Sequence, residues 1–389
     1  MTREIFAKRT NWNLETNRLS KALDEHRSAG KAFLDLTASN PTQCGFTCDG
    51  EAILRALSNP GALTYDPTPK GLESARRAVA GYYSARGDVV PVEDIFLTTS
   101  TSEAYSFVFR TMCNPGDEIL IPQPSYPLFD FLAEIQDVKL VRYPLLYDRG
   151  WQIYFHALEE AVTERTRGVI VVHPNNPTGH FTKPSEMAKL NEMCVEHQLA
   201  LIADEVFLDF ALGPNQPASF AANNFALSFT MSGLSKIAGL PQMKAAWLIV
   251  SGPQELKTHA NARLELIADT YLSVNAPVQL AIPTFFDQRQ AFRKELMARA
   301  RANLAALDEC LARQGLCSRL ELEGGWYAVL RVPATRSDEN LAIEILSRTG
   351  VFVLPGHFCD FPADGYLIVS LITPETDFAE GTKRILSLF

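Results

Sequence analysis

The chain has 389 residues, of which 47% are hydrophobic and 21% charged, and its formal net charge is −9. These values are typical of a globular protein with a large buried core and about two domains, and they exclude a fibrous chain, a disulfide scaffold and a disordered tail. An acidic chain without a basic block is a poor partner for nucleic acid or an anionic membrane, and no apolar run approaches the roughly 18 residues of a membrane span.

The first part of the chain predicts two helices. Residues 15–29 predict an amphipathic helix, because Leu19 and Leu23 lie four residues apart among charged side chains. Residues 71–86 predict a second helix, which Gly87 closes.

From residue 95 onward, apolar runs typical of strands alternate with helical patterns. The predicted strands span residues 95–98, 118–121, 138–143, 168–173, 199–203, 226–231 and 245–250, and the helices among them span residues 102–112, 126–135 and 185–197. This alternation favours an α/β fold with a mostly parallel sheet that helices cover on both faces.

The C-terminal part predicts a smaller α+β unit. A long charged helical pattern covers residues 288–313, and strands are expected at residues 320–332, 351–354 and 366–371. We therefore expect a large domain at residues 46–285 and a small domain made of residues 1–45 together with residues 286–389.

In an open α/β sheet, ligands bind beyond the carboxyl ends of the strands, so the residues after each strand are of interest. The strand at 95–98 is followed by three hydroxyl side chains at a predicted helix start, Ser100, Thr101 and Ser102. Helix capping alone would explain this run, because serine and threonine are preferred caps. The same hydroxyls, with backbone N–H groups at the positive end of the helix, would also cradle a phosphate.

Other strands also lead to residues that could do chemistry. They are followed by Asn176 in a turn Asn-Pro-Thr-Gly, by Asp204, and by Lys236 after a serine. Taken singly, a turn, a salt bridge and a solvated lysine are the ordinary explanations. A buried lysine, however, has a depressed pKa and can form a Schiff base. Together with the hydroxyl run and the aromatic Tyr126, these residues match the parts that a pyridoxal phosphate enzyme needs.

At this point the sequence resembles a known family, the class I/II aminotransferases, which are fold-type I pyridoxal phosphate-dependent enzymes. The likeness runs from the turn at residues 39–42 to Leu371 and is nearest to aspartate and alanine aminotransferases. It implies a large domain with a mostly parallel sheet flanked by helices, plus a smaller α+β domain. It also implies pyridoxal 5'-phosphate as the cofactor and the transfer of an amino group from an amino acid to a 2-oxo acid.

The resemblance assigns roles to individual residues. Lys236 would form the internal aldimine and move the proton at the substrate's α-carbon, and Asp204 would pair with the pyridinium nitrogen. Asn176 would donate to the phenolic oxygen, and Tyr126 would stack on the ring. The residues that would contact the phosphate are Ser100, Thr101, Ser102, Ser232 or Ser235, and, from the neighbouring subunit of a homodimer, Tyr65.

Three positions depart from the family pattern. Phe207 stands where the family usually has a tyrosine, so we expect a higher aldimine pKa than in relatives. Lys244 replaces a phosphate-binding arginine and keeps the charge without the bidentate fork. Ile368 stands, within one residue of alignment, where an arginine usually binds the substrate's α-carboxylate. Isoleucine cannot form that charge-assisted contact.

The isoleucine leaves alternatives open. Arg142, Arg263 or Arg331 could bind the carboxylate, His357 could supply a partial charge, or the substrate could be an amine. Another pyridoxal phosphate reaction, such as β-elimination, decarboxylation or oxidation, is a rival to transamination. A non-catalytic regulator that binds the cofactor is a lesser alternative, because the chain has no basic DNA-binding segment.

The expected partners are small molecules and a second copy of the chain, with no nucleic acid and no membrane. Residues 1–9 lack the apolar core of a signal peptide, and the seven cysteines show no zinc-binding spacing. We therefore expect a cytoplasmic protein with free thiols and no metal site.

Overall fold

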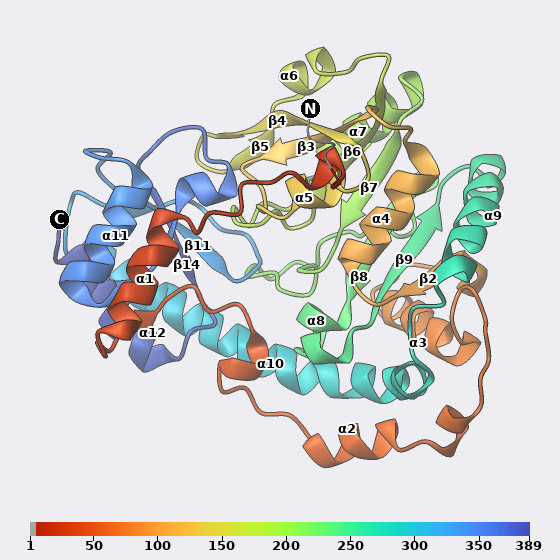
Figure 1. The fold of residues 1–389 in the computed structure, drawn as a ribbon, viewed down its shortest axis with the longest axis horizontal. Helices are drawn as coiled ribbons and strands as arrows, with labels where there is room; N and C mark the ends of the chain where they lie inside the picture. Colours follow the sequence, from red (N-terminus) through yellow and green to blue (C-terminus); the bar gives the residue numbers. More distant parts are fainter. Residues whose placement is uncertain (1–4) are drawn as a thin grey trace.

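An eight-stranded sheet forms the centre of the larger part of the molecule in the computed structural model, which describes residues 5–389 (Figure 1). Residues 1–4, which belong to the segment expected to lack a signal peptide, lie outside the described residues. The strand order is β2 (Ile95–Thr98), β9 (Ala246–Ser251), β8 (Ser228–Gly233), β7 (Ala200–Asp204), β6 (Thr166–Val172), β3 (Glu118–Gln123), β4 (Lys139–Tyr147) and β5 (Trp151–Ile153). The five strands from β8 to β4 are parallel, whereas β2, β9 and β5 pair antiparallel at the two edges.

Helices cover both faces of this sheet, because its strands are apolar on both sides. In β2, Phe96 packs on one face, and its neighbours Ile95 and Leu97 pack on the other. The first face is covered by α4 (Thr101–Met112), α5 (Phe129–Glu134) and α9 (Gln254–Tyr271). The second is covered by α3 (Glu73–Ser84), α6 (Phe155–Glu160), α7 (Pro184–Glu196) and the first part of α10 (Ala276–Ala312), on which α2 (Gly50–Leu57) also packs. The predicted α/β class with a mostly parallel sheet is thereby confirmed.

The smaller part contains segments from both halves of the chain, whereas Arg9 and Trp12 contact the larger part at Asp137 and Phe131. An antiparallel sheet has the order β10 (Ser318–Arg319), β11 (Tyr327–Arg331), β14 (Tyr366–Ser370), β13 (Leu354–Pro355). Beside it, β1 (Leu34–Asp35) pairs in parallel with β12 (Val351–Phe352). This part also contains α1 (Arg18–Ser28), α11 (Asp338–Thr349), α12 (Glu375–Leu386) and the end of α10. The domain limits 46–285 and 1–45 with 286–389 remain a prediction, because α10 runs through residue 285 without a break.

Several described elements were not predicted, namely α2, α6, α9, α11, α12 and the edge strand β5, and α10 begins earlier than predicted. The helix begins at Ala276, capped by the side chain of Asn275, twelve residues before the charged pattern at 288. Its first turns are apolar on most sides, since they are buried, and they contain Pro283. The charge pattern that signals a surface helix is therefore missing there.

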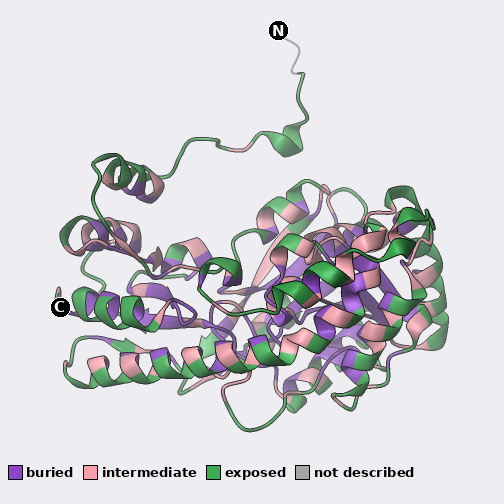
Figure 2. Ribbon diagram, turned by 90° about the horizontal axis from the view of Figure 1, so that it is seen from below, coloured by how far each residue is buried: buried purple, intermediate pink, exposed green. Residues whose placement is uncertain are grey.

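Short 3-10 turns complete the fold at Lys8–Thr10, Pro41–Gln43, Pro60–Leu63, Val92–Asp94, Pro241–Met243 and Gly356–Cys359. The buried residues concentrate in the large sheet and its helices, whereas the segment before α1 is mostly exposed (Figure 2). Among the helices of residues 5–389, none combines the length and the apolar character that crossing a membrane requires.

Candidate active site

Lys236 and Asp204 lie at the carboxyl ends of two neighbouring parallel strands. Asp204 is the last residue of β7, and β8 leads directly into the short helix α8 (Leu234–Ile237), which carries Lys236. Burial lowers the pKa of Lys236 to about 8, and the charge of Asp204 opposes this shift. Burial also raises the pKa of Asp204 to about 6, against the hydrogen bonds that it accepts and the charge of Lys236. The two groups thus titrate on either side of neutral pH.

The carboxylate of Asp204 is held by two hydrogen bonds. The backbone N–H of Val206 donates to Oδ1 over 3.1 Å, and the hydroxyl of Tyr105 donates to Oδ2 over 3.1 Å. Tyr105 lies on α4, 99 positions earlier in the chain, and it is fully buried. Sequence reasoning missed it, because an aromatic residue on a helix looks like an ordinary core residue.

Two aromatic rings enclose the amine of Lys236. Its Nζ lies 4.9 Å from the ring centroid of Trp326 and 5.6 Å from that of Phe207. The two rings pack edge to face with centroids 4.9 Å apart, and both residues are buried. Trp326 was also missed, because a tryptophan at the start of a strand looks like an ordinary core residue. Aromatic faces attract an ammonium group, so the rings of Phe207 and Trp326 favour one fixed position of the lysine side chain.

A cavity of about 240 Å³ opens beside these residues. Its polar lining consists of Asn17, Tyr126, Asn176 and Tyr327, and its apolar lining of Pro127, Pro177, Leu354, Phe358, Cys359 and Ile368. Ile368 is buried and faces this side of β14, whereas the neighbouring Leu367 packs into the core of the smaller part. The lining within residues 5–389 therefore contains no charged side chain.

The cations considered as substitutes for an arginine at position 368 lie elsewhere. Arg142 forms ion pairs with Asp130 at 2.7 Å and with Asp360 at 2.9 Å. Arg263 on α9 and Arg331 on β11 are exposed. His357 is exposed as well, with its ring packed against Phe358, and neither it nor these arginines lines the cavity.

The predicted phosphate cradle lies at the start of α4. Ser100 caps the helix, since its side chain accepts a hydrogen bond from the N–H of Glu103, and Thr101 and Ser102 form the first turn. The first N–H groups of a helix have no partner within it, so this end can bind an anion. Buried Ser232 donates to the carbonyl of Glu205 over 3.2 Å. Ser235 is half-buried on α8, and Lys244 is exposed in a left-handed conformation after Pro241–Met243.

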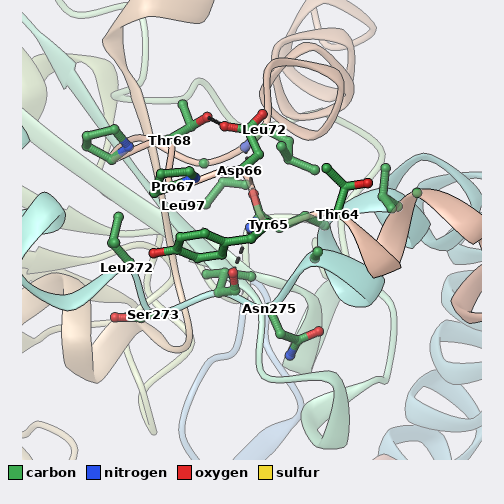
Figure 3. A pocket seen from close by; sticks show the side chains of 17 residues that line it. Thr64, Tyr65, Asp66, Pro67, Thr68, Leu72, Leu97, Leu272, Ser273 and Asn275 are labelled. Atoms are coloured by element: carbon green, nitrogen blue, oxygen red, sulfur yellow. Dashed lines mark hydrogen bonds between the residues drawn. The ribbon is translucent and has the colours of Figure 1, made fainter.

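Tyr65 does not join Lys236 within one chain. It is 78% exposed and borders a separate cavity of about 300 Å³, together with Leu272, Ser273 and Asn275 (Figure 3). The hydroxyl of Ser273 donates to Glu103 over 2.6 Å, and Glu103 lies in the first turn of α4. The Tyr65 cavity therefore adjoins the expected phosphate cradle.

The turn that carries Asn176 is clamped to the segment before Trp326. The carbonyl of Gly179 accepts a hydrogen bond from the N–H of Gly324 over 3.1 Å. Gly179 has φ +70°, and a Cβ there would lie 2.0 Å from a Leu322 side-chain carbon. Only glycine fits such a position. The neighbouring His180 is buried and lies 3.1 Å from Glu186 and 3.6 Å from Glu323.

Comparison with known proteins gives a consistent result. Residues 31–377 match the sequence model of the family described as aminotransferase class I and II. The chain is 29% identical over 373 residues to the glutamate-pyruvate aminotransferase AlaA of Escherichia coli, covering 93% of this chain and 90% of that protein. It is 28% identical over 375 residues to the alanine aminotransferase of Mycobacterium bovis, covering 92% and 85%.

Solved structures show the same architecture. An aminotransferase from Escherichia coli superposes with a TM-score of 0.88 at 25% identity, covering 100% of this chain and 98% of the other. An alanine aminotransferase from Pyrococcus furiosus superposes with a TM-score of 0.89 at 20% identity, covering 98% and 99%. The second likeness shows the fold alone.

Proposed function

Because this chain belongs to the class I and II aminotransferases, it is a pyridoxal 5'-phosphate-dependent transaminase, and we propose that the residues around Lys236 carry out its reaction. It transfers an amino group from an amino acid to a 2-oxo acid. The observation that carries the assignment of residues is the pair of Lys236 and Asp204 at adjacent strand ends. One is an amine of lowered pKa and the other a buried carboxylate.

The donor set fits the cofactor group by group. An amine of lowered pKa suits an aldehyde, and a buried carboxylate suits a protonated ring nitrogen. The N-terminus of α4 suits a phosphate, the amide of Asn176 suits a ring hydroxyl, and the face of Tyr126 suits an aromatic ring. When bound, the cofactor withdraws electrons from the substrate's α-carbon, which weakens the α-C–H bond.

Two side chains act on protons and charge, and two aromatic rings cover one of them. Lys236, neutral in part at pH 7, would accept the proton from the substrate's α-carbon and donate it again later in the same half-reaction. Asp204 holds a proton at the ring nitrogen by balancing its charge. The rings of Phe207 and Trp326 cover part of the lysine and so contribute to the burial that lowers its pKa.

We further propose that the amino donor has an uncharged side chain. Within the described residues, the cavity beside Asn176 and Tyr126 has an uncharged lining, so a second carboxylate, on the donor's side chain, would be buried there without a partner once the α-carboxylate had taken the available hydrogen-bond donors. The hydroxyl of Tyr327 and the amide of Asn17 are the polar groups of that lining that remain for the substrate's own α-carboxylate. The name of the Mycobacterium bovis relative, alanine aminotransferase, supports a small apolar donor, whereas the name of the Escherichia coli relative pairs glutamate with pyruvate.

A homodimer is proposed as the working form, with Tyr65 of each chain at the neighbour's phosphate cradle. The exposure of Tyr65 and Leu63 and the cavity between Tyr65 and Ser273 support this arrangement. We also propose a cytoplasmic location, which the seven free cysteines support.

The test is a visible absorption spectrum of the purified protein with added cofactor, before and after addition of alanine, glutamate and simple amines. The wild type is expected to show a band near that of a lysine-bound cofactor, and alanine is expected to convert it. Lys236→Ala should bind the cofactor without that band and should lose at least about 10³-fold in kcat. A band in Lys236→Ala equal to the wild-type band would refute the role of Lys236, and conversion by glutamate but not alanine would refute the proposed donor.

A further inference from the structure

Tyr105 connects two parts of the cofactor site through a single helix. Its helix, α4, begins at the hydroxyl run Ser100–Ser102, and the Tyr105 hydroxyl reaches Asp204 Oδ2 at 3.1 Å one turn later. Tyr105 is 1% exposed and Asp204 is 7% exposed, so the hydrogen bond is shielded from water. A shielded hydrogen bond to a charged group is stronger than an exposed one.

Packing fixes where this hydroxyl points. The ring of Tyr105 packs edge to face on Phe129, with centroids 5.2 Å apart. Phe129 packs edge to face on Tyr126 with centroids 6.1 Å apart, and Tyr126 lines the substrate cavity. An unbroken row of aromatic rings thus leads from the cavity to the carboxylate.

We propose that Tyr105 is a positioning residue that keeps Asp204 ionised and aimed at the cofactor's ring nitrogen. The proposal rests on the proposed role of Asp204. The hydroxyl occupies one side of Oδ2, and the Val206 N–H occupies Oδ1, so the carboxylate cannot rotate without losing both hydrogen bonds. The remaining lone pairs are left for the ring nitrogen.

The hydrogen bond from Tyr105 affects the charge of Asp204 near neutral pH. Burial raises the pKa of Asp204 to about 6, and the Tyr105 hydroxyl opposes that rise. The pKa of Tyr105 itself lies well above its usual value, because of burial and the nearby carboxylate, so it remains a donor. The other titratable groups that face Asp204 are Lys236 on α8 and Tyr126 after β3. Without the hydroxyl, the pKa of Asp204 should rise by roughly one to two units and pass neutral pH.

The experiment compares Tyr105→Phe with the matched control Tyr143→Phe. Tyr143 is equally buried in the same domain, but its hydroxyl donates to the backbone carbonyl of Ile170 over 2.8 Å. Two quantities are measured besides turnover: the pKa of the Asp204 carboxyl in the cofactor-free protein by carbon NMR, and the dissociation constant of pyridoxal 5'-phosphate by tryptophan fluorescence.

For Tyr105→Phe, we expect the carboxyl pKa to rise, cofactor binding to weaken roughly tenfold, and the acidic limb of the kcat profile to move to higher pH by the same shift. Tyr143→Phe should change none of these, even where it lowers stability. An unchanged carboxyl titration and pH profile in folded Tyr105→Phe would overturn the proposal.

A double-variant cycle separates this proposal from the function on which it rests. In an Asp204→Asn background, Tyr105→Phe should no longer weaken cofactor binding, because the charge that the hydroxyl stabilises is gone. An equal effect in both backgrounds would contradict Tyr105 as a positioning residue. If the wild-type protein instead bound no cofactor, the role of Asp204 would fail, while the NMR titration would still report on Tyr105.

Discussion

Phe207 is the residue beside Lys236 that lacks a polar group where the family usually has a phenol. It is 3% exposed and packs against Trp326, so its ring covers this side of the lysine with apolar atoms. The variant Phe207→Tyr would place a hydroxyl there, which stabilises a neighbouring anionic oxygen. We expect the pKa of the cofactor's visible band to fall by roughly one unit in a spectrophotometric pH titration. Phe207→Leu, which adds no hydroxyl, should titrate like the wild type, and an unchanged pKa in Phe207→Tyr would contradict the idea.

We expect Ile368 to set how strongly the enzyme binds a substrate carboxylate. Because the cavity lining is uncharged, the ratio of kcat/KM for alanine over that for ethylamine should be modest in the wild type. Ile368→Arg should raise this ratio roughly tenfold or more, since a charge-assisted hydrogen bond forms only with the acid. Stopped-flow measurement of the first half-reaction gives both values. Ile368→Met is the size-matched control, and a ratio that is the same in both variants would place the carboxylate elsewhere.

At the scale of elements, the turn after β6 is held to the segment before β11 by a cluster of charged side chains around the buried His180. Burial alone would lower the pKa of His180, but the nearby carboxylates of Glu186, at 3.1 Å, and Glu323, at 3.6 Å, raise it above its ordinary 6.5. The protonated His180 therefore contributes stability that is fully present below pH 6.5 and is lost as the pH rises through the folded pKa.

His180→Gln should accordingly cost about 1–3 kcal/mol of unfolding free energy at pH 6 and progressively less at pH 8 and 9. Urea unfolding at these three pH values measures the difference. The exposed His156, which lies 3.8 Å from Glu160, supplies the control variant His156→Gln, for which little change is expected at any pH. A cost for His180→Gln that grows with pH would contradict the sign of the argument.

The elements also show what sequence reasoning can reach. The strands of the large sheet are buried on both faces, so they appear in the sequence as continuous apolar runs. The residues that follow each run can therefore be located from the sequence alone. Asp204 and Lys236 were found in this way. Tyr105, Trp326 and Asn17 were not found, because they reach the site from distant elements and carry no local pattern. The position of these three residues relative to Lys236 depends on the order of strands in the sheets. That order in turn depends on contacts between distant parts of the chain.

At the scale of the whole molecule, the exposed apolar side chains near Tyr65 predict a dimer interface. Leu63 is 93% exposed and lies two residues before Tyr65. Leu63→Asp should convert the dimer to monomers at micromolar concentration and weaken cofactor binding, since Tyr65 would be removed from the neighbour's phosphate cradle. Light scattering after gel filtration measures the mass. Phe225→Asp is the control, because Phe225 is 68% exposed but borders a different groove along α7. A monomeric wild type would contradict the arrangement.

The length of α10 carries a consequence for how this protein can change over evolution. The helix has 37 residues, and successive stretches pack against the large sheet, then against Phe207 and Trp326, then into the core of the smaller part. One inserted residue rotates everything after it by about 100° and advances it by about 1.5 Å. An insertion between Met297 and Ala300 would therefore turn Leu307 and Leu311 away from their core, while the large sheet stayed intact. Insertions and deletions should accordingly accumulate in the surface loops of this family. The number of residues in α10 should stay constant, whereas the identity of its exposed side chains should vary.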